Sequence, residues 1–318
     1  MTRRLYIHVG PRKTATSTIQ RVLAGHENSV VFYPMVGRGL QAPGQVNGHH
    51  TLVREFFRGD RSADALMDSL AAECSQTDKD ILLSCELLDS KDIGAFAQAL
   101  LDHFNATLDV EILFACREHF SRAASWYNNR ARLRKVNECR LPDQFLIERA
   151  ADICYAPLVR RLGPRGVEIT ALNYHPSADW VERFLTHIGF ARDQIPAIKN
   201  ELISFSPKML VAHLAVTEVQ SEPRRRALRR ALTRMAAPRA PSGFIFGPEA
   251  AEIAEQQFAA DRQFLKDEFA IELAPPPAEA RGSGLRIGRD EFADIAAVAK
   301  DFGTDGQAVV DFASKFVR

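Results

Sequence analysis

The sequence lacks a long apolar run, an excess of charge of either sign and a leader-like N-terminus. No apolar stretch reaches the roughly 18–20 residues that a membrane-spanning helix needs. The chain begins Met-Thr-Arg-Arg and then enters a predicted strand, without the apolar stretch of a signal peptide. Its 41 Lys and Arg residues nearly balance 40 Asp and Glu residues, for a net charge of +1. We therefore expect a cytoplasmic protein with no transmembrane segment, and the charge balance gives no support for nucleic-acid binding.

Cysteine is also scarce, and its spacing excludes two common kinds of site. The five residues are odd in number and none forms a C-x-x-C pair, which argues against a disulfide framework and a structural zinc site. The adjacent pair His49-His50 has no further ligand at a recognisable spacing. We therefore expect no metal. The cysteines are Cys74, Cys85, Cys116, Cys139 and Cys154.

What the sequence does have is a regular alternation of strand and helix patterns. Short apolar runs predict strands at 5–9, 80–86, 110–116 and 167–172, and amphipathic segments separate them. Near-continuous apolar runs are typical of parallel strands that are covered on both faces. The sequence therefore predicts an α/β protein: a P-loop-like three-layer fold with a central parallel β-sheet flanked by helices, plus a helical C-terminal region.

Composition also predicts the domain boundaries. With 318 residues, of which 46% are hydrophobic, the chain can form one large α/β domain with an appendage. We expect that domain to span 1–273 and to contain, among its helices, a single helix over 143–162 and another over 244–269. A Pro- and Gly-rich linker follows at 274–284, and a short helical tail at 285–318.

The first strand leads into a loop that is rich in hydrogen-bond donors. Gly10 and Pro11 end the strand, and hydroxyl side chains then surround one lysine. In a strand–loop–helix arrangement, the loop N–H groups and the helix N-terminus together favour an anion, and Lys13 adds a full charge. The alternative is an ordinary βα turn with a polar N-cap. The candidate anion-binding residues are Arg12, Lys13, Thr14, Ala15, Thr16, Ser17 and Thr18.

This loop does not follow the nucleotide-triphosphate pattern G-x-x-x-x-G-K-[ST], because no glycine directly precedes Lys13. It resembles instead the 5′-phosphosulfate loop of the sulfotransferases, and especially bacterial sulfotransferase-like proteins that read roughly H-V-G-x-x-K-T-G-T-[ST]-[ST]-I-Q. Ala15 stands where that group usually has glycine. Alanine keeps the site small but resists a positive φ.

A second motif lies at the end of the third predicted strand. Arg117 ends this strand and Ser125 follows eight residues later, with Trp126-Tyr127 directly after it. An arginine and a serine hydroxyl can clamp a second phosphate, and the 3′-phosphate motif of the sulfotransferases has this spacing. The alternative for Arg117 is a structural ion pair with Asp109 or Glu118. Tyr174 follows the fourth strand, where the resemblance implies a tyrosine near the adenine.

The resemblance implies the donor 3′-phosphoadenosine 5′-phosphosulfate, which leaves as 3′-phosphoadenosine 5′-phosphate. Its sulfuryl group would pass to a hydroxyl or amine of a small-molecule, carbohydrate or lipid acceptor, with Lys13 stabilising the charge on the bridging oxygen. The acceptor also needs a general base. Our candidate is Glu86 at the end of the second strand, with His49 or His50 as the next choice. Glu86 alternatively caps the following segment or pairs with Lys13 or Arg12.

Two other functions stay open at this point. A nucleotide or small-molecule kinase of the same fold would need a triphosphate loop and an acidic magnesium ligand. A non-catalytic protein that only holds the nucleotide is equally compatible with the fold. A homo-oligomer is also left open by the sequence.

Overall fold

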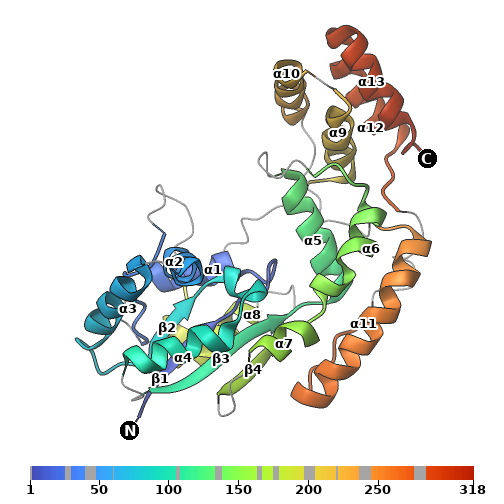
Figure 1. Cartoon of the computed structure of the whole chain (residues 1–318). Coiled ribbons are helices and arrows are strands. Elements are labelled where there is room, and N and C mark those ends of the chain that lie inside the picture. Colours follow the sequence, from blue (N-terminus) through green and yellow to red (C-terminus); the bar gives the residue numbers. More distant parts are fainter. Residues whose placement is uncertain are drawn as a thin grey trace. The chain divides into compact units, whose positions relative to one another are not determined.

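The computed structural model describes residues 2–25, 30–39, 48–59, 61–104, 108–132, 138–162, 167–174, 179–196, 205–219, 221–235, 245–275 and 284–318. The chain divides into two compact units (Figure 1). The first comprises 1–117, 154–199 and 261–273, and the second comprises 118–153, 200–260 and 274–318. The expected division at residue 273 coincides with the last residue of the first unit, but the second unit also takes two earlier segments. Most of the expected linker, 276–283, lies outside the described residues.

The first unit is built on a four-stranded sheet in the order β2-β1-β3-β4. Its strands are β1 (Arg3–His8), β2 (Ile81–Ser84), β3 (Leu108–Cys116) and β4 (Glu168–Asn173). All neighbouring pairs are parallel, so that Leu5 of β1 lies beside Ile81 of β2 and Val110 of β3. The predicted α/β class and parallel central sheet are confirmed.

Helices cover both faces of this sheet, because successive side chains of a strand point to opposite sides. Leu5 and Ile7 belong to one buried apolar cluster with α2, α3, α4, α7 and the end of α11. Tyr6, between them, belongs to the other cluster with α1 and α8. The helices of this unit are α1 (Thr16–Gly25), α2 (His50–Arg58), α3 (Arg61–Cys74), η1 (Glu86–Ser90), α4 (Ile93–His103), α7 (Ala156–Arg161), α8 (Asp179–His187) and η2 (Arg192–Gln194).

The single helix expected over 143–162 is wrong, because the structure has two helices there. The first, α6 (Pro142–Ile153), ends three residues before α7 begins at Ala156. Pro157 has no N–H to donate to the carbonyl of Ile153, as a continuous helix would require. That carbonyl accepts instead from Nη1 of Arg122, at 2.5 Å.

The described secondary structure of the second unit is helical, apart from one parallel β-bridge between Ile287 and Val317. Besides α6 it contains α5 (His119–Arg132), α9 (Pro207–Thr217), α10 (Glu222–Thr233), α12 (Arg289–Ala299), η4 (Lys300–Phe302) and α13 (Gly303–Ser314). Helix α11 (Pro248–Phe269) gives its residues up to Ala260 to this unit and the rest to the first. We expected a helix over 244–269, and the observed helix begins at Pro248. Proline suits the first position of a helix, because the backbone N–H that it lacks would have no partner within the helix there. Within the part of the chain that the structure describes, no helix combines the length and the apolar character that crossing a membrane would take.

A buried carboxylate in the first unit makes stability depend on pH. Glu111 of β3 is 2% exposed and accepts hydrogen bonds from His187 Nε2 and Thr170 Oγ1, each at 2.7 Å, and from Arg4 Nη1 at 3.1 Å. Burial alone would raise the pKa of Glu111, but these bonds hold it below its ordinary value. The hydrogen bond to Glu111 raises the pKa of His187.

We therefore expect the stabilisation by this pair to be confined to a window of pH. The contribution of Glu111 is lost as pH falls below its unfolded pKa of about 4.3, and that of His187 is lost as pH rises above its unfolded pKa of about 6.5. The difference in Tm between wild type and His187→Gln should be largest between these values and should shrink at alkaline pH. An equal difference from pH 5 to pH 9 would contradict this assignment.

Candidate functional site

The candidate site lies at the carboxyl edge of the sheet, where the strand order changes direction. From β1 the chain continues to β2 on one side, and β3 then lies on the other side of β1. In open parallel sheets, ligands bind at such a switch point beyond the strand ends. The loop after β1 and Arg117 after β3 both lie at this point.

The loop after β1 has an unusual backbone. Lys13 has φ of 73° and Ala15 has φ of 58°, although neither is glycine. Such left-handed residues cost on the order of 1–3 kcal/mol each and are concentrated at ligand sites. The Thr14 hydroxyl donates to the Pro11 carbonyl at 2.6 Å and is buried within the loop. Ala15 thus adopts the left-handed conformation that its alanine side chain was expected to resist.

The loop directs the start of α1 toward the same edge. The N–H groups of Thr18 and Ile19 donate to the Ala15 carbonyl, at 2.9 and 3.2 Å. Thr16 is 3% exposed, and its Oγ1 has no hydrogen-bond partner among the described residues. Gly10 is required here, because a Cβ on it would lie 1.9 Å from this oxygen. A buried hydroxyl without a partner at a helix N-terminus is suited to an anion. Ser17 and Thr18 follow on the first turn and are half-buried.

Arg117 brings three of the predicted site residues together. Its Nη1 donates to the Lys13 carbonyl at 3.0 Å, and its guanidinium carbon lies 5.2 Å from the centre of the Tyr174 ring. Tyr155, which the sequence analysis did not find, holds the Arg117 backbone: its hydroxyl accepts from the Arg117 N–H at 2.7 Å and donates to the Arg117 carbonyl at 2.9 Å. The sequence motifs at the ends of β1, β3 and β4 therefore meet in one place.

Ser125, the other half of the predicted 3′-phosphate clamp, lies on α5 in the second unit and is half-buried. Arg117 is the last residue of this segment of the first unit. The pairing of Arg117 with Ser125 stays a prediction. Glu118, one of the alternative partners proposed for Arg117, accepts hydrogen bonds from the N–H groups of Phe120 and Ser121, at 2.9 and 2.7 Å.

Arg12 has a carboxylate partner that the sequence analysis did not identify. Its Nη2 lies 3.4 Å from Asp89 Oδ1, and its N–H donates to Asp89 Oδ2 at 3.4 Å. The Asp89 carbonyl accepts from Arg161 Nη2 at 2.7 Å. Asp89 therefore holds Arg12 against η1. In the sequence, this partner could have been suspected only from the presence of an acidic residue in the segment after β2.

The two candidate bases face each other. His50 Nε2 lies 3.9 Å from Glu86 Oε1, and Glu86 is the more accessible of the two, with its side chain 38% exposed against 8% for His50. Glu86 is the first residue of η1, directly after the N-cap residue Cys85. The distance of 3.9 Å exceeds that of a direct hydrogen bond, so the two groups are close neighbours and not a hydrogen-bonded pair.

His49 is placed differently, with both ring nitrogens engaged. Nδ1 accepts from the Ser84 N–H at 3.1 Å, and Nε2 therefore carries the proton and donates to the Pro34 carbonyl at 3.1 Å. Burial, with a smaller effect of the Arg38 guanidinium, lowers the pKa of His49 to about 3. His49 is therefore neutral and structural, so the choice of base falls to Glu86 and His50.

No protein-family model, curated protein or solved structure matches this chain. The sulfotransferase resemblance is therefore carried by the motifs at 8–20 and 117–125 and by Tyr174. Among the described residues, no group of three or more His, Cys, Asp or Glu side chains could hold a metal ion.

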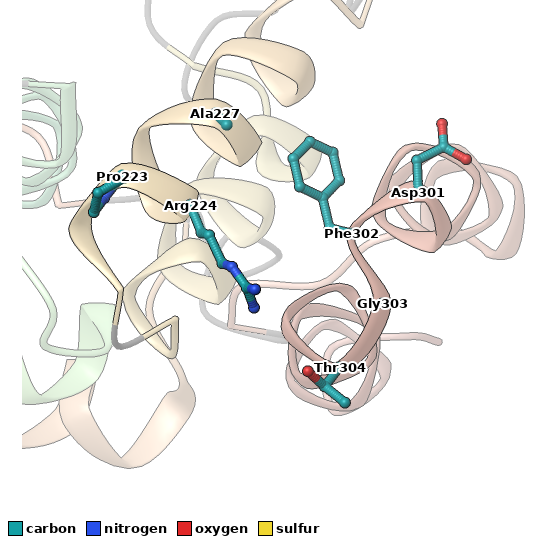
Figure 2. Close-up of a pocket in the computed structure, with 7 residues that line it drawn as sticks. All are labelled: Pro223, Arg224, Ala227, Asp301, Phe302, Gly303 and Thr304. Carbon is teal, nitrogen blue, oxygen red and sulfur yellow. The ribbon is translucent and has the colours of Figure 1, made fainter.

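The second unit has a cavity of about 560 Å³, shown in Figure 2. It lies between the start of α10 and the junction of η4 with α13, and Arg224 extends across it toward Gly303 and Thr304. The guanidinium of Arg224, on α10, pairs with the carboxylate of Asp305, on α13, at 3.0 Å. The remaining lining residues are Pro223, Ala227, Asp301 and Phe302.

Proposed function

We propose that this protein is a sulfotransferase that moves a sulfuryl group from 3′-phosphoadenosine 5′-phosphosulfate to a hydroxyl or amine. The observation that carries the proposal is the position of Arg117, which contacts both the Lys13 carbonyl and the Tyr174 ring. An arginine held there by Tyr155 leaves its charge beside the anion loop, where a nucleotide carrying two separate anionic groups would need it.

We assign each residue of the proposed site one role in binding or transfer. Thr16 Oγ1, with the N–H groups at the start of α1, would hold the 5′-phosphosulfate, and Lys13 would stabilise the charge that develops on the bridging oxygen. Tyr174 would lie against the adenine, and Arg117 would hold the 3′-phosphate. The strained backbone at Lys13 and Ala15 would then hold the hydrogen-bonding groups of the loop in place before the nucleotide binds.

The proton of the acceptor would pass to Glu86, which is the exposed member of the Glu86–His50 pair. A neutral hydroxyl attacks sulfur poorly, so removing its proton as the S–O bond forms lowers the barrier. The bond from sulfur to the bridging oxygen breaks in the same displacement, and 3′-phosphoadenosine 5′-phosphate leaves. The acceptor is a small molecule, a carbohydrate or a lipid.

The direct test is to incubate the protein with ³⁵S-labelled donor and a panel of sugar, lipid and phenolic acceptors, without added metal. We expect label to appear in at least one acceptor class and Lys13→Ala to abolish the transfer. Arg183→Ala, which removes an exposed arginine of α8, is the matched control and should transfer label normally. Donor binding without any transfer would indicate a non-catalytic binding protein. Magnesium-dependent phosphoryl transfer from ATP would indicate a kinase.

A further inference from the structure

Arg117 directly follows β3, and the hydroxyl of Tyr155 holds its backbone where the pairing of the sheet ends. The last paired residues of β3 and β4 are Cys116 and Asn173, and the Tyr174 N–H donates to the Cys116 carbonyl at 2.7 Å. At the next residue the Tyr155 hydroxyl takes the place of a neighbouring strand. It accepts from the Arg117 N–H at 2.7 Å and donates to the Arg117 carbonyl at 2.9 Å. One side chain therefore engages the backbone on both sides of the Arg117 Cα.

The position of the Arg117 guanidinium depends on this backbone. From it, Nη1 reaches the Lys13 carbonyl at 3.0 Å, and the guanidinium carbon lies 5.2 Å from the centre of the Tyr174 ring. The rotamers that a side chain can adopt depend on the backbone angles of its own residue. Because the Tyr155 hydroxyl restricts these angles at Arg117, it also restricts where the guanidinium lies. The hydroxyl therefore acts on the guanidinium through the backbone.

Tyr155 is itself held in place by a buried carboxylate on α11. Its ring is 0% exposed and stacks on Phe114, with 6.3 Å between the ring centres. Its N–H donates to Asp261 Oδ2 at 2.8 Å, and the N–H of Ala156 donates to Asp261 Oδ1 at 2.7 Å. Asp261 is 4% exposed, and its negative charge is favourable at the start of α7. Within the first unit, direct hydrogen bonds therefore lead from Asp261 through Tyr155 to Arg117.

We propose that Tyr155 and Asp261 are positioning residues for the donor nucleotide. The Tyr155 hydroxyl keeps the Arg117 guanidinium beside the anion loop, and Asp261 keeps Tyr155 where its hydroxyl meets Arg117. A phenol is suited to this role because its single O–H can donate to a carbonyl while its oxygen accepts from an N–H. The effect on nucleotide affinity rests on the proposed function, whereas the hold on the guanidinium does not.

The first measurement follows the Arg117 guanidinium in nucleotide-free protein labelled with ¹⁵N-arginine. A guanidinium held through Nη1 turns slowly about its Nε–Cζ bond and gives separate Nη signals, whereas an unrestrained one gives averaged signals. Arg117→Lys removes these signals and so identifies them. Tyr155→Phe, which keeps the ring and removes both hydrogen bonds to Arg117, should average them. The control is Tyr6→Phe, which removes the hydroxyl of a buried tyrosine bonded to the Arg4 side chain and should leave them separate.

The second measurement is a double-mutant cycle on the affinity for 3′-phosphoadenosine 5′-phosphate, determined by calorimetry. Tyr155→Phe should weaken binding by about 10-fold, close to the net contribution of a neutral hydrogen bond. In the Arg117→Ala background the same change should alter the affinity by less than about twofold, because no guanidinium is left to position. Tyr6→Phe should bind like wild type. If Tyr155→Phe does not fold, Asp261→Asn takes its place in both measurements, since it leaves only one acceptor oxygen for two N–H groups.

The outcomes separate this inference from the proposed function. Averaged Arg117 signals in Tyr155→Phe, with no nucleotide binding even in wild type, would support the hold on the guanidinium and overturn the proposed donor site. Separate signals in a folded Tyr155→Phe protein, or averaged signals already in wild type, would overturn the positioning role whatever the affinities. An equal loss of affinity in the wild-type and Arg117→Ala backgrounds would show that Tyr155 does not act through the guanidinium, and would overturn its role in donor binding.

Discussion

Replacing Glu86 by glutamine should lower turnover of 3′-phosphoadenosine 5′-phosphosulfate by about 10²–10⁴-fold, which is the usual contribution of a general base. Glutamine keeps the size of the side chain and still faces His50, but it cannot take a proton. Since Glu86 begins η1 and is not among the residues proposed to hold the donor, the affinity for 3′-phosphoadenosine 5′-phosphate should not change. Turnover is measured as the transfer of ³⁵S label, and affinity by calorimetry on the same preparation.

Asp68→Asn is the matched control for this variant, because Asp68 is also a carboxylate beside a histidine in the first unit but lies at the exposed surface. It should turn over at the wild-type rate. If Glu86→Gln also turns over normally, the base is not Glu86, and His50→Gln becomes the variant to measure.

Replacing Arg117 by alanine should weaken binding of 3′-phosphoadenosine 5′-phosphate by about 2–5 kcal/mol, the usual cost of removing one partner of a buried charged contact. This corresponds to a loss of affinity between about 30-fold and several thousand-fold. Two effects combine: the charge for the 3′-phosphate is removed, and the Lys13 carbonyl loses a hydrogen bond that supports the loop. Calorimetric titration measures the change.

Two variants show whether the effect belongs to the guanidinium. Arg117→Lys keeps the charge but loses the planar fork, so it should bind more tightly than Arg117→Ala and more weakly than wild type. Arg183→Ala should bind like wild type. Equal affinities for Arg117→Ala and wild type would remove Arg117 from the donor site.

The sheet could be predicted from the sequence because each of its strands is a short apolar run between polar segments. The runs at 80–86 and 110–116 contain β2 and most of β3, since buried parallel strands leave little room for other patterns. The break between α6 and α7 was missed although Pro157 marks it, because the apolar spacing continues through the proline. The grouping of 118–153 with the C-terminal helices depends on long-range packing, which local patterns do not report.

For the site, the sequence identified the residues at strand ends but not those that hold them. Lys13, Arg117 and Tyr174 were found because charged or aromatic residues directly after apolar strands are conspicuous. Tyr155 was not found as a site residue, because its partner Arg117 lies 38 residues away along the chain. No spacing rule connects residues so far apart, and only the fold brings them together. The approach of Glu86 to His50 is likewise a contact between residues far apart in the sequence.

We propose that the loop after β1 and Arg117 together bind a nucleotide with both a 5′- and a 3′-anionic group. Calorimetric titration of the wild-type protein with 3′-phosphoadenosine 5′-phosphate and, separately, with adenosine 5′-phosphosulfate tests it most directly. We expect the first ligand to bind much more tightly, because adenosine 5′-phosphosulfate has no 3′-phosphate for Arg117 to contact. Equal affinity for the two ligands, or no binding of either, would contradict the claim.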